Sequence, residues 1–216
     1  MAVLYPSQFQ QSMSTLKETS KDTDKQPVAY MTNSDIPVFD FDKIKNWYTH
    51  NFLKGVKLTP ASNDALFVSE DRKNIIFIEF KNGQISSTVN NEIFRKNYDS
   101  LLLLLDHRLE FDQVVNNFTG DISFTREHIE YILVYNQEVY DKYGRTKQDK
   151  LGEQRQQAKN QPQASACRDK LYKTFRALGH QELIKFGLDR FENYLFKKVH
   201  TYNKEEFNSK ISILFK

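Results

Sequence analysis

The chain has 216 residues, with 31 basic and 28 acidic side chains, a formal net charge of +3 and a single cysteine. Its length suits one domain with an appendage, and its 17 phenylalanines and 11 tyrosines exclude disorder of the whole chain. One cysteine excludes a disulfide framework and a thiolate-rich zinc site. The chain has no P-loop or Rossmann glycine motif, which argues against those nucleotide-binding sites.

The sequence favours a protein that does not enter a membrane. The longest aliphatic run, Leu101–Leu105, is far shorter than the ~20 residues that a membrane span requires. The first residues lack the basic and apolar regions of a secretion signal. We therefore expect a cytoplasmic location.

Residues 1–35 are expected to form a flexible arm, because residues 7–35 are rich in Ser, Thr, Gln, Lys and Asp and show little periodicity. An α/β core is expected over residues 36–140. Apolar side chains at helical spacing predict a helix over Asp40–Leu53, and a weaker strand is expected near Val56–Leu58.

Two strands and a turn follow. The apolar run Asp64–Val68 and the β-branched and aromatic run Ile75–Lys81 predict strands, and the polar segment Ser69–Asn74 predicts the turn that joins them. These features indicate a β-hairpin.

A helix is expected over Asn91–His107, followed by a strand that begins at Glu127 or Tyr131 and ends at Tyr135. The run Leu101–Leu105 is expected to pack on the sheet, and its alternative role is a face of a homodimer. A helix leading into the last strand indicates a parallel or mixed sheet covered by helices. The predicted fold class is therefore α/β.

Residues 141–216 are expected to form a basic loop and C-terminal helices packed on the core. The segment Glu153–Gln163 is rich in glutamine and is expected to be a surface loop. Helices are expected over Ala166–Leu178 and Leu183–Lys198, and Ile211–Phe215 is expected to be a short strand or a tail.

Positive charge is concentrated in one part of the chain. Residues 142–176 contain ten basic and three acidic side chains. Such a stretch can attract a polyanion. The alternative is a solvated segment with no partner.

Three charged side chains combine into a chemical hypothesis. Glu79 and Lys81 are two residues apart in a strand and therefore share a face, and Asp64 begins the strand expected to pair with it. Two neighbouring carboxylates repel each other unless a cation lies between them. A hard divalent cation such as Mg²⁺ prefers oxygen ligands, and a nearby ammonium group can stabilise a reacting phosphate. The set suits metal-assisted phosphodiester hydrolysis.

Asp64 followed by Glu79-Phe80-Lys81, in the order helix, hairpin, helix and strand, resembles the PD-(D/E)xK nuclease superfamily over about residues 38–136. The resemblance implies a restriction-endonuclease-like core: a mixed central sheet flanked by helices, here with a C-terminal helical addition. It also implies Mg²⁺ or Mn²⁺ held by Asp64, Glu79 and the backbone carbonyl of Phe80, with Lys81 as the catalytic lysine. The sequence departs from the superfamily at Asn63, where many members have proline.

The expected partner is nucleic acid, with DNA as the first candidate, and several basic side chains are expected to contact backbone phosphates. These are Arg95, Lys96, Lys142, Arg145, Lys147, Lys150, Arg168, Lys170 and Lys173. Two alternatives stay open. The same fold can serve as an inactive nucleic-acid-binding or protein-interaction module, such as a regulatory, antirestriction or assembly factor. The Glu-x-Lys pair can also be an ordinary solvent-facing ion pair.

Overall fold

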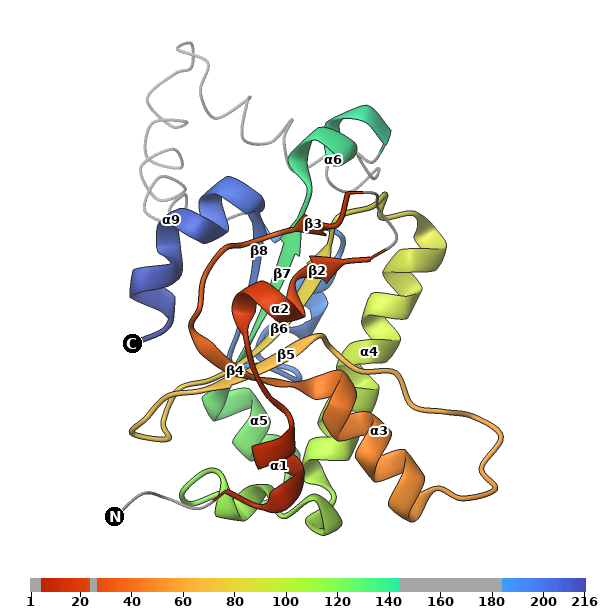
Figure 1. Cartoon of the computed structure of the whole chain (residues 1–216), viewed down its shortest axis with the longest axis vertical. Coiled ribbons are helices and arrows are strands. Elements are labelled where there is room, and N and C mark those ends of the chain that lie inside the picture. Colours follow the sequence, from red (N-terminus) through yellow and green to blue (C-terminus); the bar gives the residue numbers. More distant parts are fainter. Residues whose placement is uncertain (1–4, 24–26, 144–183) are drawn as a thin grey trace, which may run out of the picture.

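The computed structural model describes residues 5–23, 27–143 and 184–216. A mixed six-stranded sheet crosses the molecule in the order β1-β4-β5-β6-β7-β8, and helices cover both of its faces (Figure 1). The strands are β1 (Met13–Thr15), β4 (Pro37–Asp40), β5 (Ala65–Val68), β6 (Ile75–Lys81), β7 (Ile129–Tyr135) and β8 (Lys198–Asn203). Pairing is antiparallel from β1 to β6 and parallel from β6 to β8.

The central strands β6 and β7 are mainly apolar because both of their faces are covered. Their parallel register places Phe77 opposite Tyr131 and Lys81 opposite Tyr135. Successive side chains point to opposite faces of the sheet. Phe77 and Tyr131 belong to one buried cluster, and Ile78 belongs to a second cluster on the opposite face.

Two long helices cover the face that carries Phe77. Helix α3 (Phe41–Phe52) is capped by Asp40, whose carboxylate accepts a hydrogen bond from the Lys43 amide at 3.1 Å. Helix α4 (Ser87–Leu105) is capped by the Ser86 hydroxyl. Three of the five leucines at its end are buried, and Leu102 is 67% exposed. The leucine run therefore packs mainly into the core.

Helix α9 (Lys204–Leu214) covers the opposite face, where the rings of Phe207 and Phe80 pack edge to face. The remaining elements are short. They are α1 (Ser7–Gln11), α2 (Leu16–Thr19), β2 (Lys21–Asp22), β3 (Ala29–Tyr30), α5 (Ile122–His128), α6 (Gln137–Tyr143) and the 3-10 helices His107–Leu109, Phe111–Gln113 and Leu188–Phe191.

The structure confirms most of the predicted core. The expected helix at Asp40–Leu53, the hairpin strands and the turn between them correspond to α3, β5, β6 and their connection. Helix α4 begins earlier than expected, at Ser87, and the strand expected to end at Tyr135 does so. The α/β class with a mixed sheet and flanking helices is confirmed.

The flexible arm expected over residues 1–35 is not found in its described part, residues 5–23 and 27–35. Phe9, Leu16 and Met31 are buried, and β1 forms the edge strand beside β4. The carboxylate of Asp22 accepts a hydrogen bond at 2.8 Å from the side chain of Asn82, the residue that follows β6. A few apolar residues, widely spaced in a polar segment, are enough to fix the backbone when they reach the core, and this spacing gives no periodic signal.

Three other expectations were wrong. Residues 56–58 form no strand, and Val56 and Leu58 are 54% and 69% exposed. The described part of Leu183–Lys198 contains only a 3-10 helix before β8, and Ile211–Phe215 lies at the end of α9. The last difference has a local cause: Asn203 and Glu206 form a capping box that starts α9, and this helix replaces the strand or tail expected at its end. The segments expected at Glu153–Gln163 and Ala166–Leu178 lie outside the described residues.

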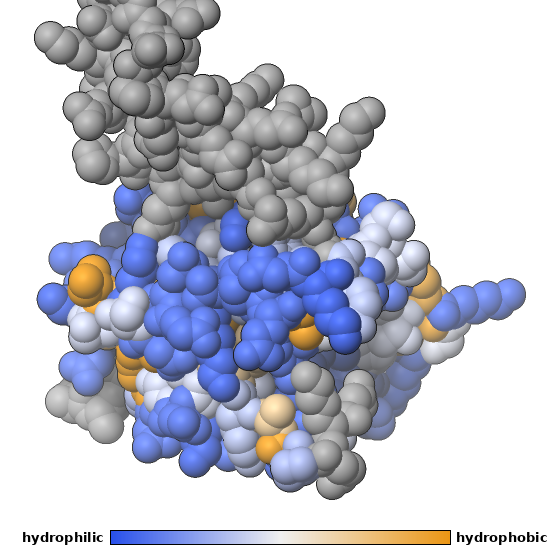
Figure 2. Space-filling view, turned by 90° about the horizontal axis from the view of Figure 1, so that it is seen from above, coloured by the Kyte–Doolittle hydropathy of each residue, from blue (hydrophilic) through white to orange (hydrophobic). Residues whose placement is uncertain are grey.

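Hydrophilic side chains cover most of the face shown in Figure 2 that is not overlaid by grey atoms, and the hydrophobic residues there form small separate patches. Among the helices in the described ranges, none has the length and apolar character needed to cross a bilayer.

Candidate active site

The candidate site lies where β5 begins and β6 ends. Ala65 pairs with Ile78 in the antiparallel register, so Asp64 and Glu79 are next to each other just beyond that pair. The carboxylate of Asp64 accepts a hydrogen bond from the Phe80 amide at 2.7 Å. The hairpin therefore brings the two acidic residues together, as the sequence predicts.

Two ammonium groups hold the Glu79 carboxylate. Lys81 Nζ and Lys96 Nζ each lie 2.7 Å from Glu79 Oε1. Lys96 Nζ also lies 3.1 Å from Asp64 Oδ1 and so bridges the two carboxylates. The Glu79 side chain is fully buried, whereas those of Asp64 and Lys81 are 18% and 23% exposed. Solvent therefore reaches this cluster of charged groups at the side chains of Asp64 and Lys81.

Helix α4 carries Lys96 and places its ammonium group beside the carboxylates of Asp64 and Glu79. Its face toward the sheet carries Ile93, Asn97 and Ser100, all of them buried. The Ser100 hydroxyl accepts a hydrogen bond at 2.9 Å from the amide of Asn63, the residue before Asp64. This contact fixes the helix against the chain that enters β5, and it sets the distance between Lys96 and the carboxylates.

Burial and mutual repulsion dominate the electrostatics of the acidic pair. Burial, together with the nearby charge of Glu79, raises the pKa of Asp64 to about 7. Burial alone would lower the pKa of the Lys96 ammonium, but the attraction of Glu79 and Asp64 raises that pKa well above its usual range. Burial also raises the pKa of Tyr131 well above 10, and the Glu79 charge adds to this effect. Tyr131 is therefore a neutral phenol.

One oxygen of the pair lacks a hydrogen-bond partner in the described part of the chain. Glu79 Oε2 is buried and receives no hydrogen bond from any residue that the structure describes. The side-chain amide of Asn63 is also buried without a hydrogen-bond partner there. Buried polar atoms of this kind ordinarily bind water, an ion or a neighbouring group. The carboxylate therefore has free capacity for a cation.

The main chain adds a further oxygen. The Phe80 amide points toward Asp64, and the N–H and C=O of one strand residue point to the same neighbouring strand. The Phe80 carbonyl thus lies on the side of Asp64, as the superfamily resemblance implies. Residues 5–23, 27–143 and 184–216 contain no cluster of three His, Cys, Asp or Glu side chains. A divalent cation here would use two carboxylates, one carbonyl and water, a set that suits Mg²⁺.

The expected phosphate contacts are only partly placed. Lys96 lies between the two carboxylates, with its side chain 20% exposed. Arg95 pairs with Asp99 at 3.2 Å and donates to the Thr59 carbonyl. Lys142 on α6 stacks over the ring of Tyr143 at 4.8 Å. The six other expected contacts, Arg145, Lys147, Lys150, Arg168, Lys170 and Lys173, lie outside the described residues.

Sequence reasoning missed the role of Lys96. A weak signal was present, because Ile93, Lys96, Asn97 and Ser100 are spaced at three and four residues and so share one helix face. A lysine and an asparagine on a helix face that also carries buried residues need polar partners on the element that packs against that face.

In comparisons with known proteins, no family model, no curated protein and no solved structure matches the chain.

Proposed function

We propose that this chain is a divalent-metal-dependent nuclease that hydrolyses phosphodiester bonds on a restriction-endonuclease-like core, with DNA as its first substrate. One observation carries the proposal. Asp64, Glu79 and Lys81 converge at the end of a buried strand, and Glu79 Oε2 has no partner among the described residues. Buried carboxylates held this close favour a cation between them.

The carboxylates of Asp64 and Glu79 and the carbonyl of Phe80 would hold Mg²⁺ or Mn²⁺. The ion supplies positive charge that neutralises the charge developing on a phosphate. Lys96 has a supporting part in this arrangement. Its ammonium holds the two carboxylates at 2.7 and 3.1 Å, so that they do not separate when the site is metal-free.

Lys81 is the group placed to act on the reacting atoms. Its ammonium lies beside Glu79 Oε1 and is partly exposed. In hydrolysis, the oxygen of a water molecule attacks phosphorus, the ester P–O bond breaks, and the leaving oxygen takes up a proton. From its position Lys81 can donate a hydrogen bond to the attacking water or to a phosphate oxygen, where charge builds up in the transition state.

The test is a cleavage assay on supercoiled plasmid, single-stranded DNA and RNA, with Mn²⁺, with Mg²⁺ and with EDTA. We expect cleavage of DNA only with metal, and a loss of at least about 100-fold in Glu79→Gln and Lys81→Met. The matched controls are Glu70→Gln and Lys73→Met in the exposed turn between β5 and β6, which retain the wild-type rate. Equal cleavage by wild type and the site variants contradicts the proposal, as does a wild type that cuts no nucleic acid.

A second function is favoured by Lys96 itself. Its ammonium occupies the space between the carboxylates that a cation would use. A site neutralised in this way permits an inactive module that binds nucleic acid through charge alone. Its signature is a salt-sensitive shift of DNA in a gel, no cleavage with either metal, and no change of thermal stability when Mn²⁺ is added.

A further inference from the structure

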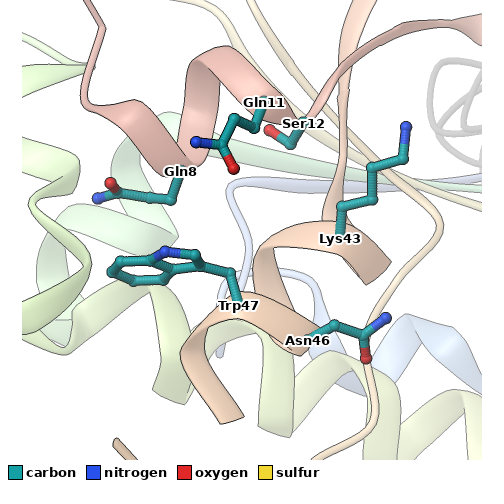
Figure 3. Close-up of a pocket in the computed structure, with 6 residues that line it drawn as sticks. All are labelled: Gln8, Gln11, Ser12, Lys43, Asn46 and Trp47. Atoms are coloured by element: carbon teal, nitrogen blue, oxygen red, sulfur yellow. The ribbon is translucent and has the colours of Figure 1, made fainter. Parts of the chain in front are cut away.

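A cavity lies between α1 and α3, apart from the acidic pair. Its volume is about 260 Å³. Gln8, Gln11 and Ser12 line it from α1 and the residue after it, and Lys43, Asn46 and Trp47 line it from α3. In Figure 3 the Trp47 indole lies beneath Gln8, and the Asn46 side chain points away from the indole. Pockets for drug-sized ligands begin at roughly 300 Å³, so this cavity suits a single small ring system.

The lining combines an aromatic platform with carboxamides. Trp47 is the only tryptophan of the chain, is half-buried and packs edge to face against Phe52 at 5.5 Å. Gln8 is buried and donates to the Leu109 carbonyl at 2.7 Å, so its side chain is held in one orientation at the edge of the pocket. The exposed amides of Gln11 and Asn46 have no hydrogen-bond partner among the residues that the structure describes. They are free to bind a ligand.

Lys43 carries the one formal charge among the six lining side chains. Lys43 is 55% exposed, and its ammonium lies 3.4 Å from the Asp40 carboxylate. None of the six lining side chains carries a negative charge. The pocket therefore accepts a ring that bears an anionic group, with Lys43 placed to attract that group.

We propose that this pocket binds an unstacked nucleobase of a single-stranded nucleic acid, a proposal that rests on the proposed nuclease function for its substrate. A base stacks on an aromatic side chain, and a carboxamide pairs in a bidentate manner with adenine. The indole of Trp47 supplies the platform, Gln11 pairs with the edge of the base, and Lys43 attracts the adjoining phosphate. Adenine is the preferred base.

Helix α3 connects the pocket to the acidic pair. The amide of Phe41, the first residue of α3, donates to the Asp64 carbonyl at 3.2 Å. Lys43, Asn46 and Trp47 follow Phe41 on the same helix. Within the proposal, a single strand bound near Asp64 continues along α3 toward Trp47.

Trp47 fluorescence tests the pocket directly, because no other residue contributes tryptophan emission. The experiment uses the full chain carrying Glu79→Gln, in EDTA, titrated with deoxyadenosine monophosphate, thymidine monophosphate, deoxyribose 5-phosphate and methyl glucoside. We expect saturable quenching by the adenine nucleotide, weaker quenching by the thymine nucleotide, and none by the two compounds that lack a base.

Variants assign the roles. Gln11→Ala should raise the Kd for the adenine nucleotide by about 5- to 100-fold. Lys43→Ala should weaken binding of the nucleotide but not of deoxyadenosine. His50→Ala, an exposed substitution on the same helix, is the matched control and keeps the wild-type Kd. Trp47→Phe, checked for folding by circular dichroism, should weaken binding of a fluorescein-labelled oligonucleotide.

The outcomes separate this inference from the proposed activity, because the titration needs neither metal nor cleavage. Metal-dependent cleavage without nucleotide quenching overturns the pocket and leaves the nuclease intact. Quenching by nucleotides without cleavage supports the pocket and overturns the nuclease. Quenching by methyl glucoside equal to that by nucleotides identifies a sugar site and overturns the inference, as does a Kd that the pocket variants leave unchanged.

Discussion

Lys96 Nζ lies 2.7 Å from Glu79 Oε1, so a lysine on helix α4 neutralises a glutamate that strand β6 buries completely. A buried charge of this kind is stable only when it is paired. The same ammonium reaches Asp64, and it therefore controls how strongly the two carboxylates repel each other. Two of the expectations below follow from this relationship.

The first concerns the removal of Lys96. We expect Lys96→Met to lower the free energy of unfolding of the metal-free protein by about 3–5 kcal/mol, because it leaves buried carboxylates short of one counter-charge. Addition of Mn²⁺ should then raise the Tm of the variant more than that of wild type, since the cation no longer competes with an ammonium group. Thermal unfolding with and without metal measures both effects.

Arg95→Met is the control for that experiment. Arg95 precedes Lys96 but forms a partly exposed pair with Asp99, and its removal should cost about 1 kcal/mol or less. A Lys96→Met variant as stable as Arg95→Met contradicts the buried bridge.

Asp64 should make the metal-free protein less stable as pH rises. The folded chain holds its proton up to about pH 7, whereas the unfolded chain loses it near pH 3.9. Between these values the folded state binds more protons, so the free energy of unfolding falls as pH increases. We expect Asp64→Asn to remove this slope, so that the variant gains stability relative to wild type from about pH 4 to pH 7.

Urea unfolding in EDTA across this range provides the measurement. Asp71→Asn in the exposed turn is the comparison, because a hydrogen bond from Ser69 lowers the pKa of Asp71 and confines its effect to more acidic solutions. Parallel stability curves for wild type and Asp64→Asn would show that Asp64 has an ordinary pKa.

Phe9 tests whether the N-terminal segment belongs to the core. Its ring is fully buried and packs against Phe39 at 5.2 Å and Phe111 at 5.9 Å. We expect Phe9→Ala to cost about 3–5 kcal/mol, measured by urea unfolding. Met13→Ala, at a site 53% exposed in the same segment, should change stability by less than about 0.5 kcal/mol. If Phe9→Ala and Met13→Ala lower the free energy of unfolding equally little, the N-terminal segment is not part of the core.

Asn203 tests the start of α9. Its side chain accepts a hydrogen bond from the Glu206 amide at 2.8 Å, and the Glu206 carboxylate accepts one from the Asn203 amide at 2.9 Å. Asn203→Ala should lower the free energy of unfolding by about 1 kcal/mol, seen as a lower urea midpoint. Ser209→Ala within the helix should have an effect of about 0.5 kcal/mol or less. A neutral Asn203→Ala would show that the capping box contributes nothing.

The central hairpin, the helices on either side of it and the proximity of Asp64 to Glu79 could be predicted from the amino-acid order alone. These features depend on a strand period of two, a short polar turn and buried apolar runs, all of which act between near neighbours in the chain. Other features became evident once the chain was seen folded. The rotation of α4 brings Lys96 to the carboxylates, Phe9 and β1 tie the N-terminal segment to the sheet, and β8 completes the parallel half. Those contacts join residues that are far apart in the sequence. They are stabilised by the packing of separate elements against one another, which the pattern of neighbouring residues does not predict.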